Sequence, residues 1–190
     1  MLQYKKMSEE ELIKYSQNDD IKALEELIKR EQKNVFASFA YLAKKQENVS
    51  DLTQEALFRM AKGIRFLKNP KSFKCWLNHI ITNVFYDDLR KVKRLPDIVP
   101  IENDDFDCEL QIPDTHCKPN EKCLSTELGL LIQNAIKSLP NQFRIAIVLR
   151  ELQGLSYEQI AEVTNSSVGT VKSRIARARG KLQDGLKNYL

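Results

Sequence analysis

The amino-acid sequence predicts an all-α protein of two small helical domains joined by a flexible acidic linker, the second domain being a helix-turn-helix. Three observations lead to this prediction. Apolar residues recur at helical rather than strand spacing over most of the 190 residues. Glycine and proline number only six each. Four of the prolines lie in one stretch without helical periodicity. We therefore expect domains over residues 1–94 and 125–190, with residues 95–124 as the linker.

Cap residues mark the expected helices of the first domain. We expect Ser8 and Asp20 to begin two helices, a third helix to follow Asp51, and Ser72 to cap a fourth, long one. The helix after Asp20 carries apolar residues at helical spacing, namely Leu24, Leu27, Ile28, Val35, Phe36, Phe39 and Leu42.

The linker differs sharply from its flanks in charge. Residues 96–121 contain eight acidic residues and one base, Lys118, whereas six Lys or Arg residues against one acid follow residue 164. This asymmetry indicates a protein with charged partners. Four residues near the linker could bind zinc or sense redox state, Cys108, His116, Cys117 and Cys123, but their spacing fits no standard zinc site. We expect no metal and reduced thiols, and keep metal or redox sensing as the minor alternative.

Helical spacing resumes near Ser125. Leu139 and Pro140 mark a new helix start and Gly154 its end. Ser156 and Gln159 then have the spacing of a capping box, and Ser167 can cap another helix beginning at Val168. A short capped helix, a tight turn and a second helix predict a helix-turn-helix.

The second of these helices has two unlike faces. Val171, Ile175, Ala178 and Leu182 form one narrow apolar stripe, which must face the core. The small residues Ser173, Ala176 and Gly180 lie opposite, between cations that include Lys172 and Arg177 on the two flanks and Arg174, Arg179 and Lys181 further round. Such a low surface lets a helix enter the major groove of DNA, about 12 Å wide. The alternative is a solvated cationic face with no partner.

The segment LPNQFRIAIVLRELQGLSYEQIAEVTNSSVGTVKSRIARARGKL, residues 139–182, resembles the promoter-binding C-terminal domain of bacterial RNA polymerase sigma factors of the small extracytoplasmic-function (ECF) group. The resemblance implies that the second helix reads the minus-thirty-five promoter element. On this basis the expected DNA contacts are Ser167, Lys172, Ser173, Arg177 and Arg179. Ala176 stands where some relatives have an aromatic residue.

Residues 51–67 predict a helix with a buried stripe of Leu52, Ala56, Met60, Ile64 and Leu67. Its polar face contains one aromatic residue, Phe58, beside Lys62, and an exposed aromatic is a candidate hot spot for a protein partner. The motif DLTQEALFRM is similar to the sigma-factor motif that docks on a coiled coil of the polymerase clamp. The resemblance implies docking through Asp51, Gln54, Glu55 and Phe58.

The following stretch, KNPKSFKCWLNHIITNVFYDDLRKVKR, is similar to the sigma-factor segment that binds the minus-ten element. Phe73, Trp76, Leu77, Ile80 and Val84 are expected in the core, and Asp87 is expected to pair with Arg90 or Lys91. The loop over residues 68–72 occupies the place where relatives capture a flipped base, so strand opening would need no ATP. The implied single-strand contacts are Lys68, Asn69, Lys71, Asn83, Arg90 and Lys91.

The sequence thus predicts a sigma factor that binds core RNA polymerase and promoter DNA, double- and single-stranded, with an anti-sigma factor as a further partner implied by the resemblance. The alternative is a helix-turn-helix regulator of duplex operators that is not a polymerase subunit. Catalytic motifs are absent, so we expect no enzymatic activity and no cofactor. No apolar run approaches the roughly 20 residues of a membrane span, and a cytoplasmic location is expected.

Overall fold

The computed structural model of the protein describes residues 2–94 and 121–187. Within these two ranges the regular structure is entirely helical and contains no strand, which confirms the predicted all-α class. Most of the predicted linker lies outside the described residues, including Cys108, His116 and Cys117. The chain is helical again from Glu121, four residues before the predicted resumption near Ser125.

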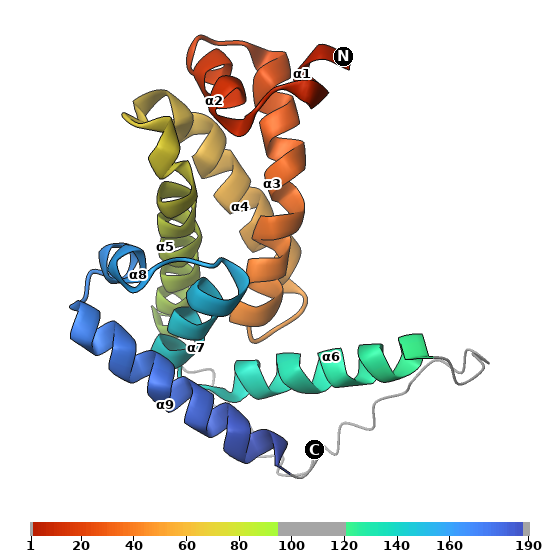
Figure 1. Ribbon diagram of the computed structural model, residues 1–190, viewed down its shortest axis with the longest axis vertical. Coiled ribbons are helices and arrows are strands. Elements are labelled where there is room, and N and C mark those ends of the chain that lie inside the picture. Colours follow the sequence, from red (N-terminus) through yellow and green to blue (C-terminus); the bar gives the residue numbers. More distant parts are fainter. Residues whose placement is uncertain (1, 95–120, 188–190) are drawn as a thin grey trace.

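The first described range folds around two long helices, α3 (Ile21–Leu42) and α5 (Phe73–Arg94), with α4 (Asn48–Gly63) beside them. The short helices α1 (Leu2–Lys6) and α2 (Glu9–Gln17) cover one end of this group (Figure 1). Two 3-10 turns, η1 (Ile64–Phe66) and η2 (Pro70–Ser72), join α4 to α5. The core between these helices contains Leu27, Phe39, Met60, Phe73 and Phe85, all fully buried.

Two predicted helix starts are confirmed by their cap hydrogen bonds. The backbone N–H of Ser8 donates to Glu11 Oε2 (2.7 Å) and the N–H of Glu11 to Ser8 Oγ (3.3 Å), a reciprocal capping box. Asp20 Oδ1 accepts the backbone N–H groups of Lys22 and Ala23 at 3.0 and 3.1 Å. Both caps satisfy donors that would otherwise lack a partner at a helix N-terminus.

Of the other two predicted starts, one is wrong and one is confirmed in position. Helix α4 begins at Asn48 instead of after Asp51, and Glu47 before it makes no side-chain cap bond. Helix α5 begins at Phe73, directly after Ser72 as predicted, but the Ser72 Oγ donates to the Asn69 carbonyl (2.8 Å). Asn69 Oδ1 accepts the Lys71 N–H (3.0 Å) and begins the η2 turn just before α5. Pro70, at the first position of that turn, has a fixed φ suited to a helix start, and η2 leads directly into α5 at Phe73.

The second described range contains α6 (Glu121–Ser138), α7 (Asn141–Ile147), a π-helical turn η3 (Val148–Leu152), α8 (Tyr157–Val163) and α9 (Val168–Leu186). Gly154 has φ +64°, a left-handed conformation that ends the α7–η3 helix as predicted. The Ser156 capping box is confirmed, with Ser156 N–H donating to Gln159 Oε1 (2.9 Å) and Gln159 N–H to Ser156 Oγ (3.2 Å).

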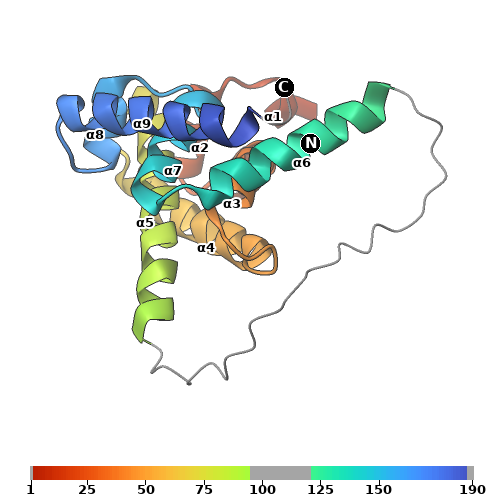
Figure 2. The same cartoon turned by 90° about the horizontal axis from the view of Figure 1, so that it is seen from below.

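The two helical domains pack against each other. Helix α8 lies against α5, and α7 and η3 contact α3 (Figure 1). The C-terminal end of α5 and the first turns of α6 project from this body in different directions (Figure 2). The sequence pattern predicted two tethered domains but not this contact.

Gly63 lies at the end of α4, where a Cβ atom would stand 2.8 Å from Trp76 Cζ2. We expect Gly63→Ala to destabilise the protein by about 1 kcal/mol, because the cost of overpacking exceeds the gain in helix propensity. Urea denaturation followed by circular dichroism measures the change. Gly180→Ala, where a Cβ meets open space, is the control and should be about 0.5–1 kcal/mol more stable than wild type. Equal effects of the two changes would contradict this packing.

Candidate nucleic-acid and docking surfaces

Helix α9 has the two faces predicted from its sequence. Val171, Ile175 and Ala178 are buried at 2% exposure or less, and Leu182 packs partly buried against the same core. Ser173, Ala176 and Gly180 are exposed on the opposite face. The exposed face is therefore a low ridge that can approach another molecule with its backbone.

The residues predicted to contact duplex DNA lie at different places on α9. Ser167 caps the helix, with its Oγ accepting the Thr170 N–H at 3.1 Å. Lys172 and Arg177 are exposed on the two flanks of the ridge, and the Lys172 ammonium lies 5.9 Å from the centre of the Tyr157 ring. Ser173 lies on the ridge and donates to the Thr170 carbonyl (2.9 Å). All four residues are exposed, on α9 or at its N-terminus.

Arg179 is engaged elsewhere. Its guanidinium forms an ion pair with Glu151 of η3 (2.6 Å), which raises the pKa of Arg179 through the hydrogen bond to that carboxylate. It also borders an apolar hollow formed with Leu152 and Tyr41. The pairing partner is 28 residues away in sequence, so helical spacing alone could not reveal it. A DNA contact from Arg179 would have to share the guanidinium with Glu151.

The polar face of α4 is exposed as predicted. Asp51, Gln54 and Glu55 point away from the core, and the Phe58 ring is 54% exposed with the Lys62 ammonium 4.2 Å from its centre. The opposite stripe, predicted to be buried, is buried: Leu52, Ala56, Met60, Ile64 and Leu67. An exposed aromatic ring among carboxylates is the arrangement expected of a protein-docking face.

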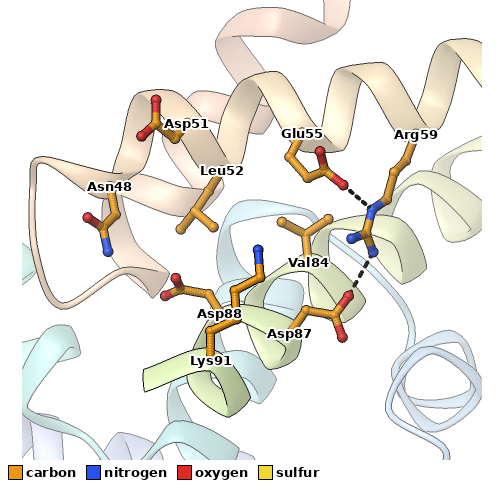
Figure 3. Close-up of a pocket in the computed structure, with 9 residues that line it drawn as sticks. All are labelled: Asn48, Asp51, Leu52, Glu55, Arg59, Val84, Asp87, Asp88 and Lys91. Atoms are coloured by element: carbon orange, nitrogen blue, oxygen red, sulfur yellow. Dashed lines mark hydrogen bonds and ion pairs between the residues drawn. The ribbon is translucent and has the colours of Figure 1, made fainter. Parts of the chain in front are cut away.

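An acidic hollow of about 350 Å³ lies between α4 and α5 next to this face (Figure 3). It contains four carboxylates against two cations: Asp51, Glu55, Asp87, Asp88, Arg59 and Lys91. Because the negative charges outnumber the positive ones, the hollow favours a cationic partner group.

Arg59 connects the two helices across this hollow (Figure 3). Its Nε donates to Glu55 Oε1 (2.7 Å) and its Nη1 to Asp87 Oδ2 (2.8 Å), and these two carboxylates raise the pKa of Arg59. Asp87 Oδ1 also accepts Arg90 Nη1 (3.3 Å), which confirms the predicted pairing of Asp87. Sequence reasoning missed Arg59, although its spacing of four from Glu55 was a usable signal.

The residues predicted to contact single-stranded DNA are all exposed, but they do not form one group. Lys68, Asn69 and Lys71 lie in the turn before α5, where the Asn69 side chain is used as a cap. Asn83 and Arg90 are seven residues apart and share one side of α5. Lys91 lies on another side and lines the acidic hollow. Trp76, predicted to be in the core, is half-buried, with its ring 5.9 Å from Phe73 and over Gly63.

The side of α5 that carries Cys75 contacts helix α8 of the C-terminal domain. Cys75 Sγ lies 3.7 Å from Glu162 Oε2 of α8. A hollow of about 330 Å³ at this place is lined by residues of both domains: Leu67, Ser72, Cys75, Trp76, His79, Glu162 and Val163. Burial, with a smaller contribution from Glu162, raises the pKa of the Cys75 thiol to about 11.

In the described ranges no group of three His, Cys, Asp or Glu side chains is placed to hold a metal ion. The same ranges contain no helix that is both long and apolar enough to cross a membrane.

Together, the fold and these surfaces define a helical protein with a helix-turn-helix in its C-terminal domain and an exposed acidic face on its N-terminal domain. Comparison with protein families matches residues 27–95 to sigma-70 region 2 and residues 129–182 to sigma-70 region 4. The chain is 32% identical over 184 residues to the ECF RNA polymerase sigma-E factor of Haemophilus influenzae, covering 95% of this chain and 96% of that protein. It is 35% identical over 176 residues to the Escherichia coli K12 sigma-E factor, covering 91% of each.

A further relative, the ECF sigma factor SigE of Mycolicibacterium smegmatis, is 34% identical over 166 residues, and the match spans 87% of this chain but 62% of SigE. Among solved structures, the sigma factor RpoE bound to the anti-sigma factor NepR from Bartonella quintana is similar, with a TM-score of 0.67 and 27% identity over 88% of this chain and 98% of RpoE. CnrH in complex with the cytosolic domain of CnrY shares the fold at 20% identity, with a TM-score of 0.66 over 95% and 97% of the two chains. The chain belongs to the ECF group of the sigma-70 family.

The raised pKa of Cys75 predicts that its thiol reacts slowly with alkylating agents. At pH 8 the thiolate fraction should be about a hundredfold below that of an ordinary cysteine with a pKa near 9, because the thiolate is the reacting species. We expect the alkylation rate to keep rising up to a pH of about 11. Iodoacetamide labelling followed by mass spectrometry of the Cys75 peptide measures the rate, with urea-unfolded protein as the reference. Glu162→Gln should increase the rate, and an ordinary rate in the folded wild type would contradict the described contact.

Proposed function

We propose that this sigma factor binds core RNA polymerase, recognises two promoter elements with its two domains and nucleates strand opening. The observation that carries the proposal is the geometry of α9, with Val171 and Ile175 buried and Ser173 and Gly180 exposed on a ridge flanked by cations. Only that orientation presents the low face to DNA. The same chain carries this α9 surface and the exposed acidic face of α4. This combination supports the hypothesis of a polymerase subunit over that of a simple DNA-binding regulator.

The minus-thirty-five element is read as duplex by α9 in this proposal. The helix N-terminus at Ser167 favours a phosphate through its free N–H groups and dipole. Lys172 and Arg177 reach phosphates or base edges from the two flanks, and Ser173 contributes a hydroxyl on the ridge. Phosphate contacts set the affinity and its dependence on salt, while contacts to base edges set the sequence preference.

Polymerase binding takes place at the exposed face of α4. Phe58 supplies the apolar anchor and Asp51, Gln54 and Glu55 supply polar contacts around it, an arrangement typical of a hot spot with a polar rim. The polymerase element that fits is the clamp coiled coil, as the motif resemblance implies. A basic side chain of that element can enter the acidic hollow between α4 and α5.

The minus-ten element is held as a single strand along the turn over residues 68–72 and the adjoining side of α5. Lys68, Lys71 and Arg90 follow the phosphates, and Asn69 and Asn83 offer hydrogen bonds to an extruded base. Extruding a base from the stack costs a few kcal/mol, and binding of the extruded base to the protein offsets this cost without ATP. Lys91 contacts this strand only if its side chain moves out of the acidic hollow between α4 and α5.

Further parts of the proposal rest on the family. An anti-sigma factor is a partner, supported by the 27% identical RpoE whose structure contains the anti-sigma factor NepR. The domains extend over residues 1–94 and 125–190 with a linker over 95–124, and the inner boundaries are supported by the matched family regions, of which the first ends at residue 95 and the second begins at residue 129. The protein acts in the cytoplasm without enzymatic activity, cofactor or metal. The alternative of an operator-binding regulator finds no support in the family comparisons.

Reconstituted transcription tests the proposal. Purified core polymerase, this protein and a genomic promoter library should produce transcripts with defined start sites, and the protein should co-elute with the core enzyme. Core polymerase alone is the control. Absence of both specific transcripts and co-elution would refute the proposal.

Arg177 and Arg179 provide a matched pair on one helix. We expect Arg177→Ala to weaken binding to duplex promoter DNA by about tenfold or more, because a base-edge or phosphate contact contributes about 1–3 kcal/mol. Arg179→Ala should have a smaller effect, because its guanidinium is held by Glu151. Fluorescence anisotropy at several salt concentrations measures both affinities. A larger loss for Arg179→Ala would show that the Glu151 pair opens on DNA.

Phe58→Ser should weaken core-polymerase binding by about thirtyfold, the effect of removing a hot spot worth about 2 kcal/mol. Phe36→Ser is the control, since Phe36 is also an exposed phenylalanine, 45% exposed, but lies on α3 outside the docking face. Biolayer interferometry with immobilised core enzyme compares the two variants. Equal affinities of Phe58→Ser and wild type would move the docking site away from α4.

A further inference from the structure

Phe66 is the most exposed large apolar side chain in the described part of the chain, at 82% exposure. It lies in the η1 turn, two residues before the turn over residues 68–72 that is proposed to hold single-stranded DNA. A single exposed phenylalanine is common on protein surfaces, so exposure alone indicates no binding site. The surroundings of Phe66 therefore decide whether its ring has a partner.

The backbone on both sides of Phe66 is held by another helix. Ile64 and Leu67 are buried, at 1% and 7% exposure. The side-chain amide of Gln17, the last residue of α2, donates from Nε2 to the Ile64 carbonyl (3.1 Å) and to the Leu67 carbonyl (2.7 Å). The ring thus extends into solvent from an anchored turn. A partner that binds it has little backbone left to order, which favours binding.

The turn that carries this ring is basic. Residues 56–86 contain six Lys or Arg residues and no acidic residue. Lys68 and Lys71 in this range are exposed. Asp19, which meets the turn from just after α2, forms an ion pair with Arg65 and so offsets one of the cations. Proteins that bind single-stranded nucleic acid combine these two features, because cations follow the phosphates while aromatic rings stack on the bases.

The ring is close to the proposed path of the strand. Two residues of extended chain span at most about 7 Å, so Phe66 and Lys68 are near neighbours. Leu67 between them is buried and has extended dihedrals, φ −69° and ψ 108°, while Phe66 and Lys68 both face solvent. A strand whose phosphate contacts Lys68 therefore passes within reach of the Phe66 ring.

A protein is the competing partner for this ring, because Phe66 follows the docking face of α4. Phe58, Lys62 and Phe66 are spaced four residues apart, although α4 ends at Gly63 before the last of them. Charge distinguishes the two places. The docking face gathers carboxylates around the acidic hollow, whereas lysines flank Phe66 along the chain. A basic environment favours a polyanionic partner for Phe66.

We propose that the Phe66 ring is a stacking surface for one base of single-stranded DNA, a subsite additional to the proposed contacts of residues 68–72 and of α5. The ring accepts the π-face of the base, so the subsite contributes affinity with little preference for sequence. The inference rests on the proposed binding of single-stranded DNA by this domain and adds a residue to it.

Fluorescence anisotropy of the full chain with a fluorescein-labelled oligodeoxythymidylate of about 12 nucleotides measures the affinity. We expect Phe66→Ala to weaken binding by about tenfold, the effect of removing a ring that stacks on one base. Phe66→Trp should bind at least as tightly as wild type, and Phe66→Leu, which is apolar but cannot stack, should be as weak as Phe66→Ala. Phe36→Ala, at an exposed phenylalanine of α3, is the control and should leave the affinity unchanged. Equal affinities of Phe66→Ala and wild type overturn the proposal.

Two further measurements distinguish stacking from a general change of the surface. A strand with abasic sites should bind wild type and Phe66→Ala equally, because the ring then has no base to stack on. The slope of log affinity against log salt should be unchanged in Phe66→Ala, whereas Lys68→Ala should reduce the slope by about 0.7, the loss of one phosphate contact. A loss in Phe66→Ala that persists on the abasic strand contradicts stacking.

The outcomes separate this subsite from the proposed function. If Phe66→Ala weakens binding to immobilised core polymerase but not to the single strand, the ring belongs to a protein interface and the proposal is wrong. If the chain, alone and with core polymerase, binds the strand no more tightly than core polymerase alone, the stacking subsite is also wrong. If Phe66→Ala weakens strand binding and yet wild type with core polymerase makes no specific transcript, the proposed function fails while the subsite stands.

Discussion

The buried guanidinium of Arg144 is the interaction on which the arrangement of the two domains depends. It donates to the Lys137 and Leu139 carbonyls at the end of α6 and to the Leu42 carbonyl at the end of α3. Carbonyls at a helix C-terminus lack intrahelical partners and carry partial negative charge, so a cation there satisfies both needs. Burial lowers the pKa of Arg144, but an arginine keeps its charge because its ordinary pKa lies far above neutral pH. One side chain therefore fixes the α6–α7 corner and ties it to the other domain.

The parts of this structure that sequence predicts well are those encoded within one or two helical turns. The helix start at Ser8, the capping box at Ser156 and the buried stripe of α9 each depend on residues three or four apart, and all three are confirmed. The helix start that failed is that of α4, which begins at Asn48 without a side-chain cap bond that the sequence could signal. Contacts between distant segments left no such signal. Arg59 with Asp87, Arg179 with Glu151, and Gln153 with α3 join residues 28 to 119 positions apart.

Charge is divided between the surfaces in a way that keeps their proposed partners apart. The hollow between α4 and α5 gathers four carboxylates, whereas the exposed flanks of α9 carry Lys172 and Arg177. The carboxylates repel nucleic acid from the first surface, and the cations attract it to the second. Arg59 links the two helices of the acidic surface, and through Asp87 it is connected to Arg90 on the side of α5 proposed to follow DNA. Every side chain in these ion pairs is more than a third exposed, so each pair contributes about 1 kcal/mol or less.

The same reasoning about magnitude applies to the contact between the two domains, which combines hydrogen bonds with apolar packing. Each hydrogen bond between the domains contributes a net of about 0.5–1.5 kcal/mol, because separation replaces it with a bond to water. Tethering makes the contact intramolecular, so even a few such bonds keep the domains together. Apolar side chains of both domains add to the contact, because Tyr41 of α3 and the buried Ile136 and Val148 line one hollow beside these hydrogen bonds. Apolar area removed from water contributes about 25 cal/mol per Å², so this packing and the hydrogen bonds act together to hold the domains against each other.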